Sequence, residues 1–163
     1  MKSLIVFCFT ILLASVVDIS SKWVIFEKYK DSGYKTLIPN FLGIICSRNE
    51  GIAFGLFPNK SNALIYLTLF AVVIIVWLYY RSDKEDILNT LGLAFIISGA
   101  IGNLWDRIFF HAVRDFIDIH AGNLHWPTFN IADVLICTGV GLVILKNKNK
   151  GNEIHHKPVE KES

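Results

Sequence analysis

The sequence has little charge for its length. Only 18% of its 163 residues are charged and 53% are hydrophobic, whereas charged residues make up about 25% of soluble domains. The net charge of +2 is spread along the chain, so no basic segment predicts a nucleic-acid partner. Low charge with a high apolar content excludes a disordered chain and indicates a protein that resides in a membrane.

Cysteine is scarce, and the common metal and nucleophile motifs are missing from the sequence. The three cysteines are Cys8, Cys46 and Cys137. An odd number without Cys-x-x-Cys spacing argues against a disulfide framework and against a cysteine zinc site. There is no His-Glu-x-x-His helix and no Gly-x-Ser-x-Gly turn. Because His111, His120 and His125 have no spacing that singles out a metal site, we expect neither a metal nor a cofactor.

Long hydrophobic runs, in contrast, are present. A transmembrane helix needs about 20 mostly apolar residues, and four runs of this kind occur, at residues 3–26, 63–80, 87–105 and 126–145. The third run contains Ser98, Gly99, Ala100 and Gly102. Such small residues let helices approach closely within a bilayer. The sequence therefore predicts an all-α integral membrane fold with four transmembrane helices.

The first run has an alternative interpretation as a cleaved signal peptide. Lys2 is followed by an apolar stretch that ends near Ala14 and Ser15, which fits the pattern of a secretory leader. Apolar residues resume after Asp18 and continue to Phe26. Three further spans also make a removable leader less useful, so we favour a retained span.

Four spans place both termini on one side of the membrane. Lys and Arg are denser on that side, which predicts cytoplasmic termini by the positive-inside rule. Residues 27–62 and 108–125 are then extracytoplasmic, and the β-branched residues and glycines of 36–57 predict a small sheet there. The polar residues 146–163 predict a disordered cytoplasmic tail.

Two ionisable residues lie inside the first span. An ionisable side chain at bilayer depth is costly, so it usually faces the protein interior. Asp18 and Lys22 are four residues apart, which predicts an intrahelical ion pair. A structural pair explains Lys22 better than a catalytic serine–lysine pair with Ser15 or Ser21 does.

The segment 113–133 concentrates acids near the start of the last span. Asn130 precedes Asp133 by three residues, so Asn130 can cap the helix and Asp133 can occupy its first turn. Capping alone would explain Asp133, whereas a catalytic role needs a second carboxylate, for which Asp115 and Asp118 are candidates. Two adjacent carboxylates share a proton, as in aspartic proteases, where one accepts a proton from water and the other donates to the scissile carbonyl.

Two other classes of function remain open at this point. Asp106 and Arg107 lie at the outer end of the third span, and with Asp18 and Lys22 they could line the ion pathway of a small transporter. A non-catalytic scaffold for membrane helices is the other alternative. Paired acids at the outer membrane surface favour an enzyme over both.

Five motifs follow one another in a fixed order. They are Asp18-x-x-x-Lys22, Asn49-Glu-Gly-Ile-Ala-Phe-Gly55, Gly102-Asn-Leu-Trp-Asp-Arg107, Val113-Arg-Asp-Phe116 and Phe129-Asn-Ile-Ala-Asp133. The set resembles the bacterial lipoprotein signal peptidases, also called signal peptidase II. The resemblance implies an intramembrane aspartic endopeptidase of the bacterial cytoplasmic (inner) membrane. We expect a monomer surrounded by membrane lipid. Its implied substrates are prolipoproteins, cut immediately N-terminal to a diacylglyceryl-modified cysteine.

The same resemblance implies roles for individual residues. Asp115 and Asp133 correspond to the catalytic pair, which leaves Asp106 and Asp118 outside it. Positions that orient this pair or hold the substrate correspond to Asn49, Asn103, Arg107 and Asn130. Structural support corresponds to Asp18, Lys22, Gly51 and Asp106. The sequence departs from the family pattern at Ser21, Val134 and Arg114. We expect the Arg114 side chain to point outward, toward lipid headgroups.

Overall fold

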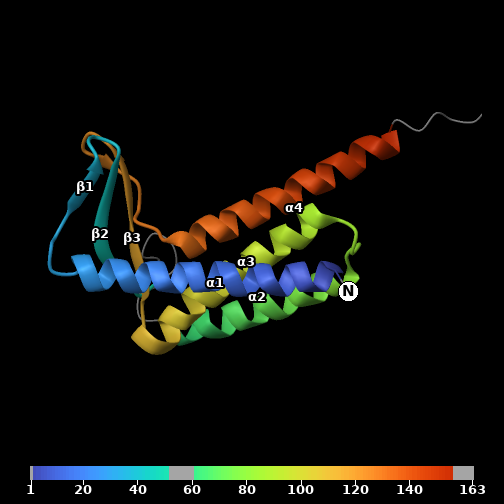
Figure 1. Cartoon of the computed structure of the whole chain (residues 1–163), viewed down its shortest axis with the longest axis horizontal. Coiled ribbons are helices and arrows are strands. Elements are labelled where there is room, and N and C mark those ends of the chain that lie inside the picture. The colour runs from blue at the N-terminus through green and yellow to red at the C-terminus, as the bar shows by residue number, and fades with distance from the viewer. Residues whose placement is uncertain (1, 52–60, 156–163) are drawn as a thin grey trace, which may run out of the picture.

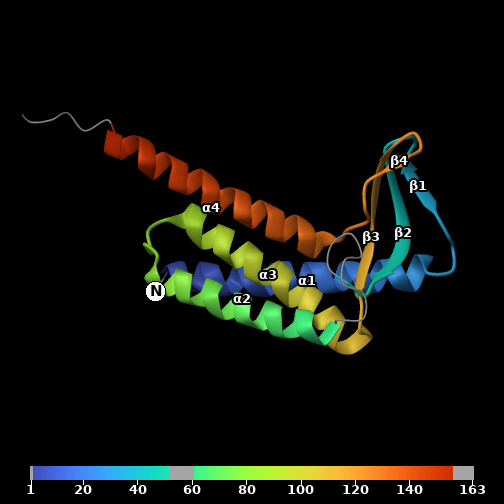
Figure 2. The ribbon, with the colours of Figure 1, turned by 180° about the vertical axis from the view of Figure 1, so that it is seen from behind.

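The computed structural model describes residues 2–51 and 61–155, which form helices and one antiparallel sheet (Figure 1). The helices are α1 (Lys2–Tyr29), α2 (Ser61–Arg81), α3 (Ile87–Phe110) and α4 (Ile131–His155). The strands are β1 (Lys35–Ile38), β2 (Leu42–Asn49), β3 (Val113–Ala121) and β4 (Leu124–His125). The helices lie alongside one another and the sheet stands at one end of them, as the view from behind also shows (Figure 2).

The apolar runs form helices as the sequence predicts, although their limits differ. Among the described residues, three helices are long and apolar enough to cross a membrane: Lys2–Tyr29, Ala63–Arg81 and Ile87–Phe110. The fourth helix is not among them, so the layout with four spans stays a prediction. Residues 126–130 of the fourth predicted span are not helical; Phe129 instead pairs with Ile117 of β3.

The first helix has its polar side chains inside and its apolar side chains outside. Its buried residues are Phe7, Ser15, Asp18 and Lys22, which recur at helical spacing. Large apolar side chains such as Phe9, Leu12 and Trp23 are exposed. Lipid solvates apolar groups and leaves polar groups unpaired, so this distribution suits a helix in a bilayer.

The third helix lies at the centre of the bundle and contacts each of the other helices. Small residues permit this close packing, because a Cβ on Gly99 would collide with the Ala132 carbonyl of α4. Farther along the same interface, Gly92 of α3 faces Gly139 of α4. On the opposite side, Leu93, Ala94 and Ile97 pack with Phe7 and Tyr79 in a buried apolar cluster. The small residues of the third span therefore lie where α3 packs closely against α4, as the sequence predicts for Gly99.

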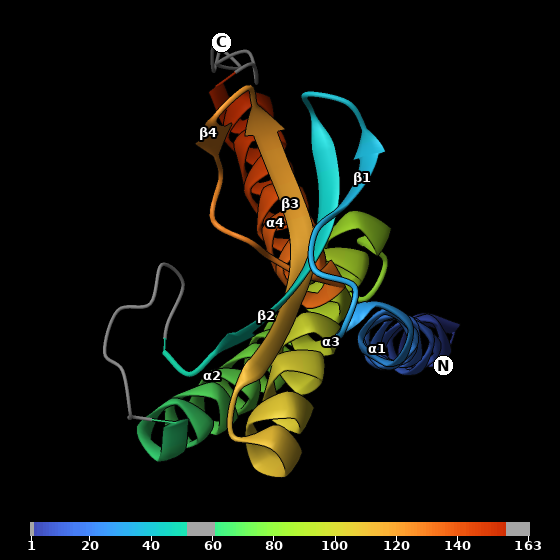
Figure 3. The same ribbon diagram turned by 90° about the vertical axis from the view of Figure 1, so that its left-hand side faces the viewer.

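The sheet has the strand order β1-β2-β3-β4, with every neighbouring pair antiparallel. Strands β1 and β2 form in the segment 36–57, where the sequence predicts a sheet, except that β1 begins one residue earlier, at Lys35. Residues 52–57 of that segment lie outside the described residues. Strands β3 and β4 come from the second long connection, where the sequence did not predict strands. Figure 3 shows β2 and β3 side by side, crossing the end of α3. Strand β3 buries the charged residues Arg114, Asp115 and Asp118. Its sequence therefore lacks the alternation of apolar and polar residues that predicts a half-buried strand.

The end of α4 requires a correction. The sequence predicted a disordered tail from residue 146, but α4 continues to His155. Lys146 contributes an ion pair, with its Nζ 3.3 Å from the Asp86 carboxylate that caps α3. A helix that is already formed extends readily through residues such as Lys and Glu, because propagation costs much less than nucleation. Residues 156–163 of the predicted tail lie outside the described residues.

Candidate active site

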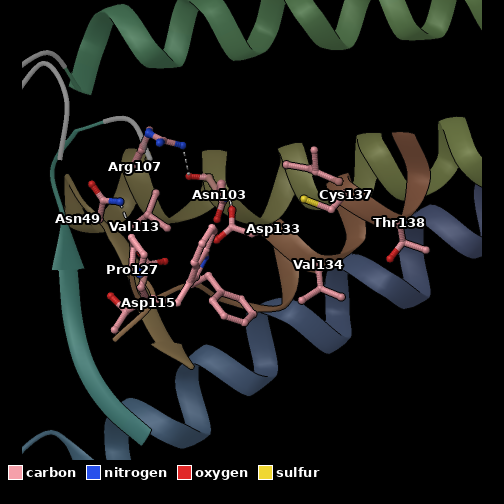
Figure 4. A pocket seen from close by; sticks show the side chains of 14 residues that line it. Asn49, Asn103, Arg107, Val113, Asp115, Pro127, Asp133, Val134, Cys137 and Thr138 are labelled. Carbon is pink, nitrogen blue, oxygen red and sulfur yellow. Dashed lines mark hydrogen bonds between the residues drawn. The ribbon is translucent and has the colours of Figure 1, made fainter. Parts of the chain in front are cut away.

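A cavity of about 530 Å³ lies where the helices meet the sheet (Figure 4). Its polar wall includes Asn49 at the end of β2, Asn103 and Arg107 of α3, and Asp115 of β3. The first turns of α4 supply Asp133 and an apolar wall. The segment 126–129, which joins β4 to α4, completes the lining. Segments distant in sequence thus bring two carboxylates to one cavity.

Asp115 is held by two side-chain amides. Its Oδ1 accepts a hydrogen bond from Asn130 Nδ2 at 2.6 Å, and its Oδ2 accepts one from Asn49 Nδ2 at 3.2 Å. The residue is only 2% exposed. Because both partners are donors, the carboxylate is fixed in orientation at the cavity wall.

Asp133 lies in the first turn of α4 and forms a reciprocal cap with Asn130. The Asp133 backbone N–H donates to Asn130 Oδ1 at 3.1 Å, and the Asn130 backbone N–H donates to Asp133 Oδ2 at 3.1 Å. This arrangement satisfies N–H groups that would otherwise lack partners at the helix start. The predicted capping is therefore confirmed, and the same contacts leave Asp133 Oδ1 free to accept from Asn103 Nδ2 at 2.9 Å.

The amides of Asn103 and Asn130 have one consistent orientation. Lys22 Nζ lies 2.9 Å from Asn103 Oδ1, and an ammonium can only donate, so this atom must be the amide oxygen. Nδ2 of Asn103 therefore points to Asp133. Likewise Asn130 Oδ1 accepts from a backbone N–H, which leaves its Nδ2 to donate to Asp115 and to Asn103 Oδ1. One chain of hydrogen bonds thus connects Lys22 to both carboxylates.

A buried ion network lies behind these amides. Lys22 Nζ is 2.8 Å from Asp18 Oδ2, so the predicted ion pair forms, and 3.7 Å from Asp106 Oδ2. Asp18 Oδ1 accepts the Ala132 backbone N–H of α4 at 2.7 Å. A Cβ on Gly102 would collide with the Asp18 carboxylate. Since Asp18 and Lys22 come from α1, the first hydrophobic segment is an integral part of the site.

The expectation for Arg114 is wrong. Its side chain does not point outward; it is 5% exposed and pairs with Asp106, with Nη2 2.7 Å from Oδ1. Its backbone N–H also donates to Asp106 Oδ2 at 2.9 Å. The guanidinium lies 4.1 Å from the centre of the Phe110 ring, a favourable cation–π distance. Asp106 is fully buried beside Lys22. The inward orientation of Arg114 pairs this buried carboxylate with a second positive charge, which offsets part of the cost of removing it from water.

Arg107 connects the third helix to the end of β2. Its guanidinium donates to the Asn103 carbonyl and to the Gly51 carbonyl, each at 3.4 Å. The Gly51 backbone N–H donates in turn to Asn49 Oδ1 at 3.1 Å. The residues singled out at Asn49, Gly51, Asn103 and Arg107 therefore lie together at one edge of the cavity.

The structure separates the two open candidates for the second carboxylate. Asp115 lines the cavity, whereas Asp118 does not and instead contacts Tyr34, His120 and His125. One feature of the site was missed in the sequence: the cavity lining at 126–129, because an apolar run that continues into α4 has the composition of a span. Pro127 was a usable signal, since a proline disfavours helix in the residue before it.

The electrostatics of the site distinguish Asp115. Burial raises the pKa of its carboxyl, and the nearby charge of Asp133 raises it further, from 3.8 to about 6. The amides of Asn130 and Asn49 oppose this change without cancelling it. A carboxyl with a pKa of about 6 can hold a proton and release it close to neutral pH.

The pKa of Asp115 predicts how stability depends on pH. The folded protein binds this proton more tightly than the unfolded chain, so stability is lost as pH rises through about 6. Moving a pKa from 3.8 to about 6 corresponds to about 3 kcal/mol. We therefore expect Asp115→Asn to gain up to about 3 kcal/mol relative to wild type between pH 4 and pH 8.

Chemical unfolding in detergent micelles at several pH values would measure this difference. Asp31→Asn is a matched control, because Asp31 is exposed and its removal should leave the pH profile unchanged. A constant offset between wild type and Asp115→Asn across the range would contradict the prediction, since loss of a hydrogen-bond acceptor alone does not depend on pH.

Comparison with known proteins identifies the family. The family model described as signal peptidase (SPase) II matches residues 10–147. The chain belongs to the signal peptidase II family. It is therefore a peptidase, which decides between the peptidase, transporter and scaffold interpretations of the sequence.

Individual relatives agree with this membership. The lipoprotein signal peptidase of Syntrophotalea carbinolica is 37% identical over 142 residues, covering 85% of this chain and 88% of the relative. That of Serratia proteamaculans is also 37% identical over 142 residues, covering 83% of this chain and 82% of the relative.

Solved structures share the fold of this signal peptidase II family member. One bacterial membrane enzyme, solved by the in meso method, superimposes with a TM-score of 0.86 at 26% identity, covering 95% of this chain and 94% of that chain. Another has a TM-score of 0.78 at 27% identity, covering 86% and 91%. These likenesses and the apolar helices together indicate a membrane enzyme.

Proposed function

We propose that this signal peptidase II family member is an aspartic endopeptidase that removes signal peptides from prolipoproteins. The cut falls immediately N-terminal to a cysteine that carries a diacylglyceryl group. Relatives named lipoprotein signal peptidase support the substrate class. The single observation that carries the mechanism is the cavity shared by Asp115 and Asp133, in which Asp133 raises the pKa of Asp115.

The two carboxylates have different tasks in the first step. Asp133, at the positive end of α4, carries the negative charge, and Asp115 carries the proton. Water attacks the scissile carbonyl carbon while Asp133 takes a proton from the water. Asp115 donates its proton to the carbonyl oxygen, which gives a neutral tetrahedral diol.

The second step reverses both proton transfers. Asp133 gives its new proton to the leaving nitrogen as the C–N bond breaks. Asp115 takes a proton from one diol hydroxyl, so the carbonyl re-forms as a carboxylic acid. The products are the signal peptide and a lipoprotein with a free amine on its modified cysteine, and the carboxylates return to their starting state.

The surrounding amides keep the carboxylates ready for this cycle. Asn49 and Asn130 donate to Asp115, and Asn103 donates to Asp133. Fixed donors stabilise negative charge without reorganising during the reaction. Arg107 completes the cavity edge, where it can hold the peptide near the scissile bond.

The cavity suits a substrate that arrives from the bilayer. Its α4 wall is apolar at Val134, Ile136 and Cys137, and Val134 is 43% exposed on the outside of the bundle. Acyl chains could therefore remain in lipid while the peptide enters sideways. We propose a monomer surrounded by membrane lipid.

We further propose that the protein spans the bacterial cytoplasmic (inner) membrane four times. Figure 1 supports a common side for the N-terminus and the α2–α3 connection, since both lie at the end away from the sheet. Lys and Arg are denser on that side, which supports cytoplasmic termini and an extracytoplasmic active site.

A gel-shift cleavage assay tests this function directly. The purified full-length chain in detergent is mixed with one prolipoprotein in two forms, with and without diacylglyceryl on its cysteine. We expect cleavage of the modified form alone, and mass spectrometry should place the new carboxyl end at the residue before the cysteine. A Cys→Ser prolipoprotein, which cannot be modified, is the matched control.

Each alternative result has a defined meaning. Equal cleavage of both forms would refute the lipid requirement while leaving the peptidase intact. Absence of cleavage by folded protein would refute the proposed substrate class.

A further inference from the structure

A second cluster of polar side chains lies outside the active-site cavity. Asp118 and His120 of β3 meet His125 of β4, with one ligand-type atom of each within 4.8 Å of the others. His125 Nδ1 is 2.9 Å from Asp118 Oδ1, and His120 Nδ1 is 3.2 Å from Asp118 Oδ2. None of these residues lines the cavity, and the proposed mechanism uses none of them.

The backbone holds the three side chains on one face. Asp118 and His120 are two residues apart on β3, so they point to the same side of the strand. His125 pairs directly with His120 across the β3–β4 hairpin. The hairpin turns tightly at Gly122, whose φ of +60° favours glycine. Figure 2 shows β4 at the end of the sheet that stands clear of α1, α2 and α3.

The two histidine rings present the same nitrogen to one carboxylate. The two imidazoles stack with centroids 4.8 Å apart and planes 17° apart, and both direct Nδ1 toward the same carboxylate. The Asp118 side chain is 4% exposed and that of His120 is 9% exposed. Imidazole nitrogens and carboxylate oxygens are common zinc ligands.

Tyr34 provides the outer support that metal ligands usually have. Its hydroxyl donates to Asp118 Oδ2 at 2.9 Å and lies 3.1 Å from His120 Nδ1, so it holds both side chains in place. Tyr34 can lie here because Gly43 of β2 has no side chain; a Cβ on Gly43 would collide with the tyrosine ring. The connection before β1 thus covers the hairpin cluster.

We propose that Asp118, His120 and His125 bind one Zn²⁺ ion, through a carboxylate oxygen and the two Nδ1 atoms, with water as fourth ligand. Tetrahedral zinc with bonds of about 2.1 Å separates its ligand atoms by about 3.4 Å. The separations of 2.9 and 3.2 Å around Asp118 are close to this value. Zinc binding requires the three ligand atoms, which lie within 4.8 Å of one another, to converge, and His120 Nδ1 to exchange its 3.1 Å contact with the Tyr34 hydroxyl for the ion. This proposal goes beyond the peptidase function and is independent of it. It departs from the expectation that the sequence holds no metal, because the hairpin brings His120 and His125 together with Asp118.

The bound ion has a structural consequence for the active site. It links β3 to β4 through side chains, in addition to the hairpin backbone. Trp126, the residue after His125, begins the segment that lines the cavity and leads into α4. Zinc at the hairpin therefore stabilises the segment that connects the sheet to Asp133.

Zinc binding to the purified full-length chain tests the proposal. The chain has five histidines, so His155→Ala/His156→Ala provides a background without the two nearest the C-terminus, and any affinity tag is removed. We expect about one Zn²⁺ per chain by competition with a chromophoric chelator. Co²⁺ should give the visible absorption of a tetrahedral site, and Zn²⁺ should raise the Tm.

Variants in this background locate the site. Losing an outer-shell partner usually weakens metal affinity about 10- to 100-fold, so His125→Ala, which removes a ligand, should weaken Zn²⁺ binding at least about 100-fold. Tyr34→Phe should weaken it about tenfold. His111→Asn is the matched control: His111 has a φ of 57° at the end of α3, which asparagine tolerates, and its loss should leave binding unchanged.

Two results would overturn the proposal. One is the absence of stoichiometric Zn²⁺ binding by the folded background protein. The other is equal affinity in His125→Ala and the background. His125 has a half-exposed side chain, so its replacement should not prevent folding, and the Tm without metal checks this.

Discussion

Replacing Asp133 or Asp115 by asparagine is expected to reduce lipoprotein cleavage by about a thousandfold or more, because general acid–base catalysis contributes about 10²- to 10⁴-fold for each participating group. An amide in place of the Asp133 carboxylate cannot take a proton from water, and an amide in place of the Asp115 carboxyl cannot donate one to the carbonyl in the same way. Asparagine retains the size of the side chain and one acceptor oxygen, so the hydrogen bonds around each position persist in part. The turnover rate with a diacylglyceryl-modified prolipoprotein measures the loss.

Asp31→Asn is the matched control for these variants. It removes the same carboxylate from an exposed position before β1, and it should cleave like wild type. The double variant Asp115→Asn/Asp133→Asn should be no slower than either single variant, because the two groups act as one unit. Wild-type cleavage by folded Asp133→Asn would refute the proposed catalytic pair.

Lys22→Met is expected to lower the free energy of unfolding by about 3 to 5 kcal/mol, the usual result of removing one partner from a buried ion pair. Lys22 and Asp18 are both fully buried, and Lys22 is also 3.7 Å from Asp106. Without the ammonium, Asp18 loses the cation that it pairs with, and Asp106 keeps its ion pair with Arg114. Unfolding in detergent, followed by tryptophan fluorescence, measures the change.

Cleavage should fall together with stability in Lys22→Met. The ammonium holds Asn103 Oδ1, which in turn directs Asn103 Nδ2 to Asp133. Adding Asp18→Asn should recover part of the lost stability, because it removes the unpaired charge and keeps an acceptor for the Ala132 N–H. Lys30→Met is the control, since Lys30 pairs with Glu27 at an exposed position, where such pairs contribute about 0 to 1 kcal/mol. A loss in Lys22→Met no larger than in Lys30→Met would show that the buried network does not stabilise the fold.

Local features of this protein were determined by the sequence. Helix length and apolar content indicate membrane helices, and three of the described helices have them. The Asp18–Lys22 ion pair and the Asn130–Asp133 cap join residues three or four apart. Such contacts follow from helical geometry alone, so the spacing of residues predicts them.

Contacts between distant segments were decided by the tertiary structure. The residues alone left Asp115 and Asp118 equally eligible as the partner of Asp133; the path of β3 brings Asp115 to the cavity and Asp118 to the histidines. The inward direction of Arg114 depends on Asp106, eight residues away across the turn from α3 to β3. The pairing of His120 with His125 depends on the hairpin register. Strand register and helix packing are set by the burial of the whole chain, and a pattern of neighbouring residues does not contain that information.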